Sequence, residues 1–224
     1  LAVLEKAGCR ILLAAPTGRA ARRLADSSGH PAVTVHRLLE YTPNGGGFNF
    51  GKNDGDPLDA DAIIIDEASM LDITLTYHLL KAVQGGCRLI FVGDVDQLPS
   101  VGAGSVLKDI IRSQKMPVVR LENVFRQAEI SPIVRNAHRI NRGQMPEWEP
   151  SSDFTFVEIE NEFDAAEYVA NIYARLTQQS DWQSVQVLSP MHKNPCGVQN
   201  LNHLLQQRIN PPELNKSEVN TPGN

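Results

Sequence analysis

Short apolar runs alternate with amphipathic stretches along the first half of the chain. The runs are continuous rather than alternating, as in strands that a parallel sheet buries on both faces. They lie at Arg10–Ala15, Ala62–Ile65 and Arg88–Val92, with a shorter one at Val118–Leu121. Helical patterns lie at Thr17–Ala25, from Ser69 to about Val83, and at Ser105–Ile111. This order predicts an α/β fold in which helices flank a parallel sheet.

The second half of the chain carries another set of elements, beginning near Asn123. Helical patterns occur at Ser131–Ile140, Glu162–Gln178 and Gly197–Ile209, and strand patterns at Phe154–Ile159 and Val185–Ser189. Gly, Asn, Asp, Ser and Pro are frequent in three segments that we expect to be loops. These are Asn44–Pro57, Gly143–Pro150 and Pro211–Asn224. We therefore predict two domains, residues 1–122 and 123–224.

The composition is that of an ordinary globular protein, with 42% hydrophobic and 21% charged residues in a chain of 224. No apolar run approaches the ~20 residues that cross a bilayer, so no membrane partner is expected. Cys9, Cys87 and Cys196 have no disulfide or metal-site spacing, which favours a reducing, cytoplasmic setting. A net charge of -5 argues against a protein that coats nucleic acid by bulk charge. It leaves room for a narrow groove that follows one strand.

Two carboxylates, Asp66 and Glu67, stand at the end of the apolar run Ala62–Ile65. Ligands of open α/β sheets gather at the carboxyl ends of the strands. An Asp there suits a hydrated Mg²⁺ that bridges nucleotide phosphates. The next residue of a strand points to the other face, so the Glu suits a base that activates water. The alternative is that the pair only caps the helix expected from Ser69.

The run Arg88–Val92 is also followed by a carboxylate, Asp94, with Gln97 just beyond it. An amide donates and accepts hydrogen bonds without adding charge, so Gln97 suits a sensor that touches a γ-phosphate and a water. The alternative is a Gly-Asp turn with an incidental Gln. Two carboxylate-ended strands in succession favour phosphate chemistry over that turn.

Two further segments combine hydroxyl and basic side chains. In Pro16–Arg19 a strand gives way to a helix, and backbone N–H groups at a helix start bind phosphate well. The alternative is an ordinary loop in which Thr17 caps the helix. The other segment holds Thr34, His36 and Arg37. A single histidine such as His36 is more often structural than functional.

The segments APTGRAA, TVHRLL, IIIDEASMLD, FVGDVDQLPSVGAG and LENVFRQ, in this order, resemble successive motifs of the RecD/TraA family of superfamily 1 DNA helicases. The resemblance covers the chain from Cys9 to about Asn210. It implies two RecA-like domains, here an incomplete first domain and part of a second. It also implies hydrolysis of ATP with Mg²⁺ between them and 5′-to-3′ movement on single-stranded DNA. The family works in DNA recombination and repair, in some members alongside other subunits of a nuclease-helicase complex.

The resemblance also assigns roles by position. Asp66 corresponds to the Mg²⁺ ligand and Glu67 to the catalytic base. Gln97 corresponds to the γ-phosphate sensor, with support from Asp94. Arg126 resembles an arginine finger from the second domain, whose planar cation stabilises the transferring phosphoryl group. Contacts to DNA are implied for Pro16, Thr17, Gly18, Arg19, Thr34 and His36 in the first domain, and for Lys193 and Asn200 in the second.

The family's P-loop, GxxxxGK(S/T), is not found in this sequence. Gly46–Asn53 nearly fits the spacing, but an Asn replaces the final hydroxyl residue, no buried strand precedes it and no helix pattern follows. We expect the P-loop upstream of Leu1, with Leu1–Ala7 as the end of its helix, and the late motifs beyond Asn224. The chain would then be a fragment that is inactive alone.

Two other functions fit part of the pattern. One is a P-loop ATPase that acts on RNA or is coupled to a nuclease. The segments at Thr17 and Thr34 argue against it, since they have no obvious purpose without a DNA strand to grip. The other is a non-catalytic domain that binds DNA or partner subunits. The intact pairs Asp66–Glu67 and Asp94–Gln97 argue against it, because a scaffold does not need them.

Overall fold

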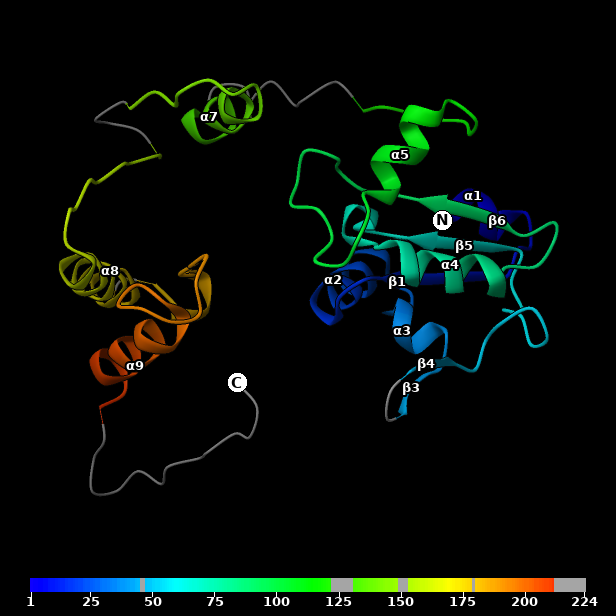
Figure 1. Cartoon of the computed structure of the whole chain (residues 1–224), viewed down its shortest axis with the longest axis horizontal. Helices are drawn as coiled ribbons and strands as arrows, with labels where there is room; N and C mark the ends of the chain where they lie inside the picture. Colours follow the sequence, from blue (N-terminus) through cyan, green and yellow to red (C-terminus); the bar gives the residue numbers. More distant parts are fainter. Residues whose placement is uncertain (45–46, 122–130, 149–152, 179, 212–224) are drawn as a thin grey trace. The chain divides into compact units, whose positions relative to one another are not determined.

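The chain divides into two compact units, Leu1–Arg126 and Gln127–Asn224. The computed structural model describes residues 1–44, 47–121, 131–148, 153–178 and 180–211, and does not describe the side chains of 44, 47 and 48. Figure 1 shows both units, with labels on most of their helices and strands. That the units are an incomplete and a partial RecA-like domain stays a prediction.

The first unit is built on a four-stranded parallel sheet in the order β2-β1-β5-β6 (Figure 1). Strand β1 is Ile11–Ala15, β2 is Ala32–Thr34, β5 is Ala62–Ile65 and β6 is Arg88–Phe91. Buried apolar residues dominate β1 and β5, the two central strands. Strand β6 lies at the edge, where Ile90 stays partly exposed. The predicted parallel α/β sheet is confirmed.

Helices connect and border these strands. They are α1 (Ala2–Lys6), α2 (Gly18–Ser28), α3 (Val35–Leu38), α4 (Ile73–Ala82) and α5 (Val106–Ser113), with a 3-10 turn η1 at Ala68–Met70. The helix predicted from Ser69 therefore begins later, at Ile73. The cause is Asp72, whose carboxylate accepts a hydrogen bond from the Leu75 N–H at 2.7 Å and caps α4.

The strand predicted at Val118–Leu121 is wrong. The segment has no ladder partner among the described residues, and the side chains of Val119 and Leu121 are exposed. An isolated extended segment does not count as a strand, because a strand exists only through hydrogen bonds to a neighbour.

Part of the predicted loop Asn44–Pro57 is instead a β-hairpin. Strand β3 (Tyr41–Asn44) pairs antiparallel with β4 (Gly47–Phe50). Phe50 anchors the hairpin, because it is buried and its ring centroid lies 4.3 Å from that of His78 on α4. The near-match to a P-loop thus falls on a hairpin strand and a turn, with no helix directly after it.

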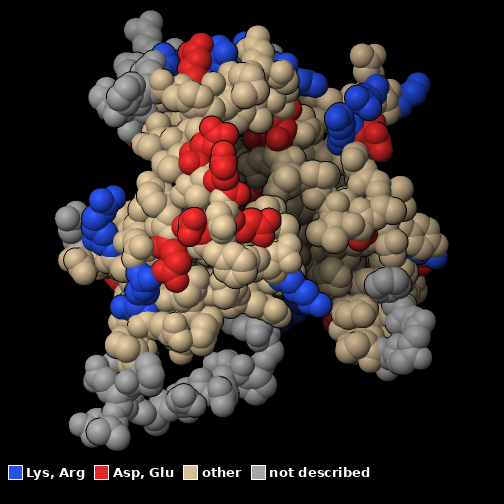
Figure 2. Space-filling model, turned by 60° about the vertical axis from the view of Figure 1, so that its left-hand side comes forward, with Lys and Arg blue, Asp and Glu red and all other residues tan. Residues whose placement is uncertain are grey.

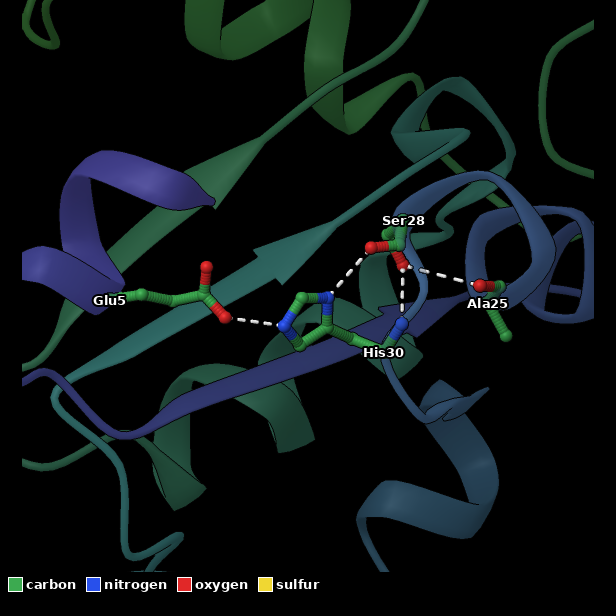
Figure 3. Close-up of polar contacts among 4 residues, drawn as sticks. All are labelled: Glu5, Ala25, Ser28 and His30. Carbon is green, nitrogen blue, oxygen red and sulfur yellow. Dashed lines mark hydrogen bonds and ion pairs between the residues drawn. The ribbon is translucent and has the colours of Figure 1, made fainter.

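A short polar chain ties α1 to the end of α2 (Figure 3). The backbone carbonyl of Ser28 accepts from Nδ1 of His30 at 2.7 Å, and the other ring nitrogen contacts the Glu5 carboxylate. The Ser28 carbonyl, and then the hydrogen bond and charge of Glu5, raise the pKa of His30 above its usual 6.5. The charged imidazole is therefore the form that this junction stabilises.

The hydrophobic core of the first unit lies between the sheet, α3 and α4. Its largest fully buried side chains are Val35, Leu39, Ile63, Ile65, Leu71 and Leu79. Val35 and Leu39 come from α3 and the residue after it, and Leu79 comes from α4. This core fixes β5, and therefore the residues that follow Ile65.

The second unit consists of helices among its described residues. They are α7 (Pro132–Asn141), α8 (Glu162–Thr177) and α9 (Val198–Ile209), with a 3-10 turn η2 at Trp182–Ser184. The three predicted helices are confirmed, and α8 packs against α9. No described helix of the chain is both long and apolar enough to span a membrane.

The strands predicted at Phe154–Ile159 and Val185–Ser189 are wrong. Neither segment has a ladder partner in the described part of the second unit. The alternation was nevertheless meaningful, because Thr155, Val157 and Ile159 line one groove together with α8. Their side chains face a helix, while their backbones have no sheet to join.

Candidate functional site at the carboxyl edge of the sheet

The parallel sheet brings the predicted residues of the first unit to one edge. In the register of the sheet, Ala14 pairs with Ile65, and Ile65 pairs with Phe91. Ala15 pairs with Thr34 on the other side. The segments that begin after these residues therefore leave the sheet at the same edge. Those segments carry Pro16 and Thr17 after β1, Asp66 and Glu67 after β5, and Asp94 after β6, while Thr34 ends β2.

Asp66 and Glu67 are both half-buried at this edge. The Asp66 N–H donates to the carbonyl of Ala14 at 2.9 Å, which continues the β1–β5 ladder by one residue. Glu67 then leaves the extended conformation, with φ 51° and ψ 39°. The left-handed region costs a side-chain-bearing residue about 1–2 kcal/mol. Such backbone outliers occur at sites where the surrounding structure holds them.

This geometry corrects one step of the sequence argument. Glu67 does not point away from Asp66 through strand alternation, because Glu67 is no longer part of a strand. The alternative that the pair only caps a helix also receives no support. Glu67 makes no side-chain capping bond to η1, and α4 is capped by Asp72 instead. Both carboxylates therefore remain available for other chemistry.

The segment after β6 starts with a turn built on Asp94. Its carboxylate accepts from the Asp96 N–H at 2.9 Å, and its backbone carbonyl accepts from the Gln97 N–H at 3.3 Å. The side chains of Asp94 and Gln97 are exposed. Asp94 thus sets the start of the loop that carries Gln97. Their predicted roles at a γ-phosphate stay a prediction.

The start of α2 combines a capped helix with an open backbone. The Thr17 hydroxyl accepts from the Ala20 N–H at 3.2 Å, so the capping alternative holds for this residue. Gly18 is exposed, and a Cβ placed on it would meet nothing within 4 Å. Packing inside the described structure therefore does not require glycine at this position. Pro16 is half-buried just ahead of the cap, and Arg19 is exposed on the first turn.

Thr34 and His36 both have structural contacts. The Thr34 hydroxyl accepts from the Arg37 N–H at 3.2 Å and caps α3. The His36 ring lies edge-on to Tyr41, with 5.5 Å between ring centroids. His36 therefore belongs to an aromatic cluster that joins α3 to the hairpin, which is the structural role that its residue type favoured.

Lys193 and Asn200 belong to the second unit. Lys193 is exposed in the loop before α9. The Asn200 amide donates to the carbonyl of Pro195 at 2.7 Å and so holds that loop to the helix. Gly197 lies where a Cβ would come 2.2 Å from the Lys193 carbonyl oxygen. The loop is thus tightly folded, with Lys193 on its outside.

Arg126 lies outside the described residues.

The charges at the sheet edge suit a cation. Asp66, Glu67, Asp94 and Asp96 stand within two neighbouring segments, and acidic side chains also gather on the face shown in Figure 2. No group of three or more His, Cys, Asp or Glu in the described chain forms a ready-made metal cage. Mg²⁺ needs no such cage, because one or two carboxylates with substrate phosphates and water suffice. The Asp66 carboxylate fits that role.

Sequence reasoning missed three residues next to this edge. The Ser69 hydroxyl is buried without a hydrogen-bond partner among the residues described. Gly102 and Gly104 lie where a Cβ would strike Asp72 and Ile73. The repeated glycine in the segment Val101–Gly104 was the only sequence sign of such a close approach.

Known proteins provide an independent comparison. A family model described as "AAA domain" matches residues 1–160. The chain is 42% identical over 209 residues to the ATP-dependent RecD2 DNA helicase of Deinococcus radiodurans, covering 93% of this chain and 28% of that protein. It is 43% identical over 118 residues to the RecBCD enzyme subunit RecD of Mycobacterium tuberculosis, covering 46% of this chain and 20% of that protein.

Among solved structures, Bacteroides Pif1 bound to ssDNA matches with a TM-score of 0.41 and 21% identity, covering 76% of this chain and 48% of that one. The chain spans less than a third of the length of each of the two relatives with RecD in their names. The predicted resemblance to RecD-type helicases is confirmed by these relatives. Because the family model covers most of the chain, the protein belongs to the AAA domain family.

Proposed function

We propose that the chain is the central part of an ATP-dependent helicase that moves along single-stranded DNA in recombination or repair. The observation that carries the proposal is the meeting of Asp66, Glu67 and Asp94 at one edge of a parallel sheet. The same residues lie in a stretch that is 42% identical to a protein named as a RecD2 DNA helicase. Movement from 5′ to 3′ and a cytoplasmic location are part of the proposal.

The carboxylates of Asp66 and Glu67 have different roles in hydrolysis. Glu67 accepts a proton from the water that attacks the γ-phosphate, and its half-buried position limits competing solvent. Asp66 would hold Mg²⁺, which when bound neutralises charge on the phosphates. Gln97, exposed on the loop that Asp94 starts, contacts the γ-phosphate and reports its loss.

The grip on DNA rests on the start of α2. The open backbone at Gly18 lets a phosphate approach the first N–H groups of a helix, and exposed Arg19 adds charge. Pro16, Thr17, Thr34 and His36 are proposed as further contacts to DNA, with Thr17 and Thr34 also capping their helices. In the second unit, Lys193 contacts a phosphate while Asn200 keeps its loop in place.

Other subunits are proposed on narrower ground. The Mycobacterium tuberculosis relative is named as a subunit of the RecBCD enzyme, whereas the Deinococcus radiodurans relative carries no complex in its name. A partner of this chain would therefore be a further subunit of a nuclease-helicase complex. Isolation of the native protein, followed by measurement of its mass in solution, distinguishes a complex from a single chain.

The test is ATP turnover by the full-length protein with and without single-stranded DNA. Single-stranded DNA should raise turnover. Glu67→Gln should lower turnover about 10²- to 10⁴-fold, the usual contribution of a general base, while a fluorescent ATP analogue still binds. Glu158→Gln, an exposed change of the same type in the second unit, is the matched control and should keep full turnover.

Three outcomes would contradict the proposal. Turnover that persists in Glu67→Gln would remove Glu67 as the base. Stimulation by RNA but not by DNA would favour the RNA-acting ATPase. Binding of DNA without any ATP turnover in the unmodified full-length protein would favour a non-catalytic DNA-binding domain.

A further inference from the structure

The loop that carries Gln97 contacts the segment after Glu67 at both ends of the loop, near Val92 and near Gly104. At the near end, the Ala68 N–H donates to the Val92 carbonyl at 2.9 Å. A Cβ on Gly93 would lie 3.0 Å from the backbone nitrogens of Ala68 and Ser69. A distance of 3.0 Å is tighter than ordinary van der Waals contact. The two backbones can approach this closely because residue 93 has no side chain.

At the far end, the loop closes on the start of α4. The Ile73 N–H donates to the Ala103 carbonyl at 2.9 Å. A Cβ on Gly102 would lie 2.2 Å from Oδ2 of Asp72, the residue that caps α4. A Cβ on Gly104 would lie 2.5 Å from Cγ1 of Ile73, and Gly104 has φ +99°. A Cβ at Gly102 would displace the Asp72 side chain, and a Cβ at Gly104 would displace the outer carbons of Ile73.

The far end is also tied within itself. The Ser100 hydroxyl lies 3.0 Å from the Gly102 carbonyl oxygen and 2.8 Å from the Gly104 carbonyl oxygen. These hydrogen bonds hold the backbone of Val101–Gly104 in one conformation. Gln97 lies in sequence between this segment and the Asp94 turn, so the backbone is fixed on both sides of Gln97.

The partner of both contacts is a short, well-anchored segment. It begins directly after Glu67 and ends at Ile73, where α4 starts. Leu71 is fully buried, as is Leu79 on α4, so the segment cannot shift without disturbing the core. The strained backbone of Glu67 and the loop of Gln97 therefore share one rigid support.

We infer that Gly93, Gly102 and Gly104 are positioning residues that set Gln97 against Glu67 for hydrolysis. They act through the close approach of the loop to the segment Ala68–Ile73, Gly93 against its backbone and Gly102 and Gly104 against the side chains of Asp72 and Ile73, and do not themselves touch the nucleotide. The inference rests on the proposed function, since it concerns the same reaction. It adds a physical link between the base and the sensor, namely the segment Ala68–Ile73.

The test compares two glycines with the same backbone problem but different surroundings. Gly104→Ala places a Cβ against Ile73, whereas Gly86→Ala, at φ +92°, places one in open space. Both changes strain the backbone. In the full-length protein, Gly104→Ala should lower kcat for DNA-stimulated ATP turnover about 10- to 100-fold, as a displaced catalytic group does. The KM for ATP and the thermal midpoint should change as little as in Gly86→Ala.

A second change should restore the lost rate. Cβ of Ile73 lies 3.5 Å from the position that a Cβ on Gly104 would take, an ordinary contact, so only the outer carbons of Ile73 obstruct. Ile73→Ala removes those carbons, and Ile73 is 57% exposed, so the change is mild for folding. The double variant Gly104→Ala with Ile73→Ala should recover most of the kcat.

Each outcome decides something. Equal kcat in Gly104→Ala and Gly86→Ala overturns the inference, as does a double variant with no recovery. If Gly104→Ala fails to fold, the double variant must fold and turn over ATP, and its failure overturns the inference too. Absence of DNA-stimulated turnover in the unmodified protein overturns the proposed function instead.

Discussion

The two units differ in what holds them together. The first unit has a contiguous core in which the sheet packs against α3 and α4, with Ile63, Ile65 and Leu79 fully buried. In the described part of the second unit, the buried apolar side chains are Ala166, Ala170, Tyr173 and Leu201. Three of these lie on α8 and one on α9. In its described part, the second unit thus has a small contact between α8 and α9, where the first unit has a layered core.

Specific polar contacts join parts of the second unit. Asn136 on α7 is buried and exchanges two hydrogen bonds with the backbone of Glu147, at 2.7 and 2.8 Å. Arg208 on α9 contacts Glu167 and Asn171 on α8. Large apolar side chains such as Phe163 and Trp182 remain exposed. A layered core fixes the strand that precedes Asp66 and Glu67, whereas hydrogen bonds hold the loops in both units.

The largest expected effect concerns the junction between the units. Arg126 is predicted to act as an arginine finger of the second domain, although the boundary between the compact units falls just after it rather than at residue 122. Arg126→Ala should lower DNA-stimulated ATP turnover of the full-length protein about 10³-fold or more, because a cation at the transferring phosphoryl group is lost. Steady-state kinetics measure it, with Arg120→Ala, an exposed arginine nearby, as control. A near-normal rate would place Arg126 away from the site.

The next effect compares buried and exposed isoleucines. Ile63→Ala should destabilise the first unit by about 2–5 kcal/mol, because it removes buried methylene groups from a packed core. Ile140→Ala on α7, where the side chain is 57% exposed, should change stability by less than about 0.5 kcal/mol. Urea unfolding of each variant measures the difference. Equal losses would mean that the two units do not differ in packing as described.

A smaller effect tests the polar support of the second unit. Asn136→Ala should cost about 1–3 kcal/mol, because it leaves the backbone N–H and carbonyl of Glu147 without their partner. Asn141→Ala, an exposed change at the end of the same helix, is the control. Hydrogen exchange of the second unit follows both variants. Unchanged protection in Asn136→Ala would mean that water replaces these bonds at no cost.

The smallest effect is the pH dependence at His30. The folded state raises the pKa of His30, so the charged ring contributes stability that is fully present below 6.5. That contribution is lost as pH rises through the higher folded pKa. Relative to His30→Gln, the unmodified chain should therefore lose thermal stability between mildly acidic and mildly alkaline pH. If the difference in melting temperature between the two proteins is the same at every pH, the contact of His30 with Glu5 and Ser28 contributes nothing.

Much of the first unit could be predicted from the sequence. Strand β5 has the predicted bounds, and β1 and β6 are one residue shorter than expected. These runs are both apolar and paired within the chain, so local pattern and tertiary structure agree. The start of α4 was misplaced because the capping strength of Asp72 outweighed the helical pattern before it. The hairpin was missed because Gly and Asn are frequent in the sequence from Asn44 to Phe50, while a single residue, Phe50, provides the anchor.

The strands of the second unit could not be predicted in the same way. At Phe154–Ile159 the alternation identified the side of the chain that faces α8, but not the absence of a ladder partner. A strand depends on a neighbour that is often distant in sequence, whereas a helix makes its hydrogen bonds within its own segment. The helices α7, α8 and α9, which the structure describes in this unit, were accordingly found.

By itself, the sequence determined that Asp66 and Glu67 follow one apolar run and that Asp94 and Gln97 follow the next. Residue order also sufficed to place Asp66 and Asp94 at strand ends, because apolar runs are local. Only the tertiary structure decided that Glu67 leaves the strand in a left-handed conformation and that Asp72, not Glu67, caps α4. It alone brought Gly93, Gly102 and Gly104 against the segment Ala68–Ile73. Contacts between backbones far apart in the chain leave almost no trace in a residue pattern, since their main requirement is the absence of a side chain.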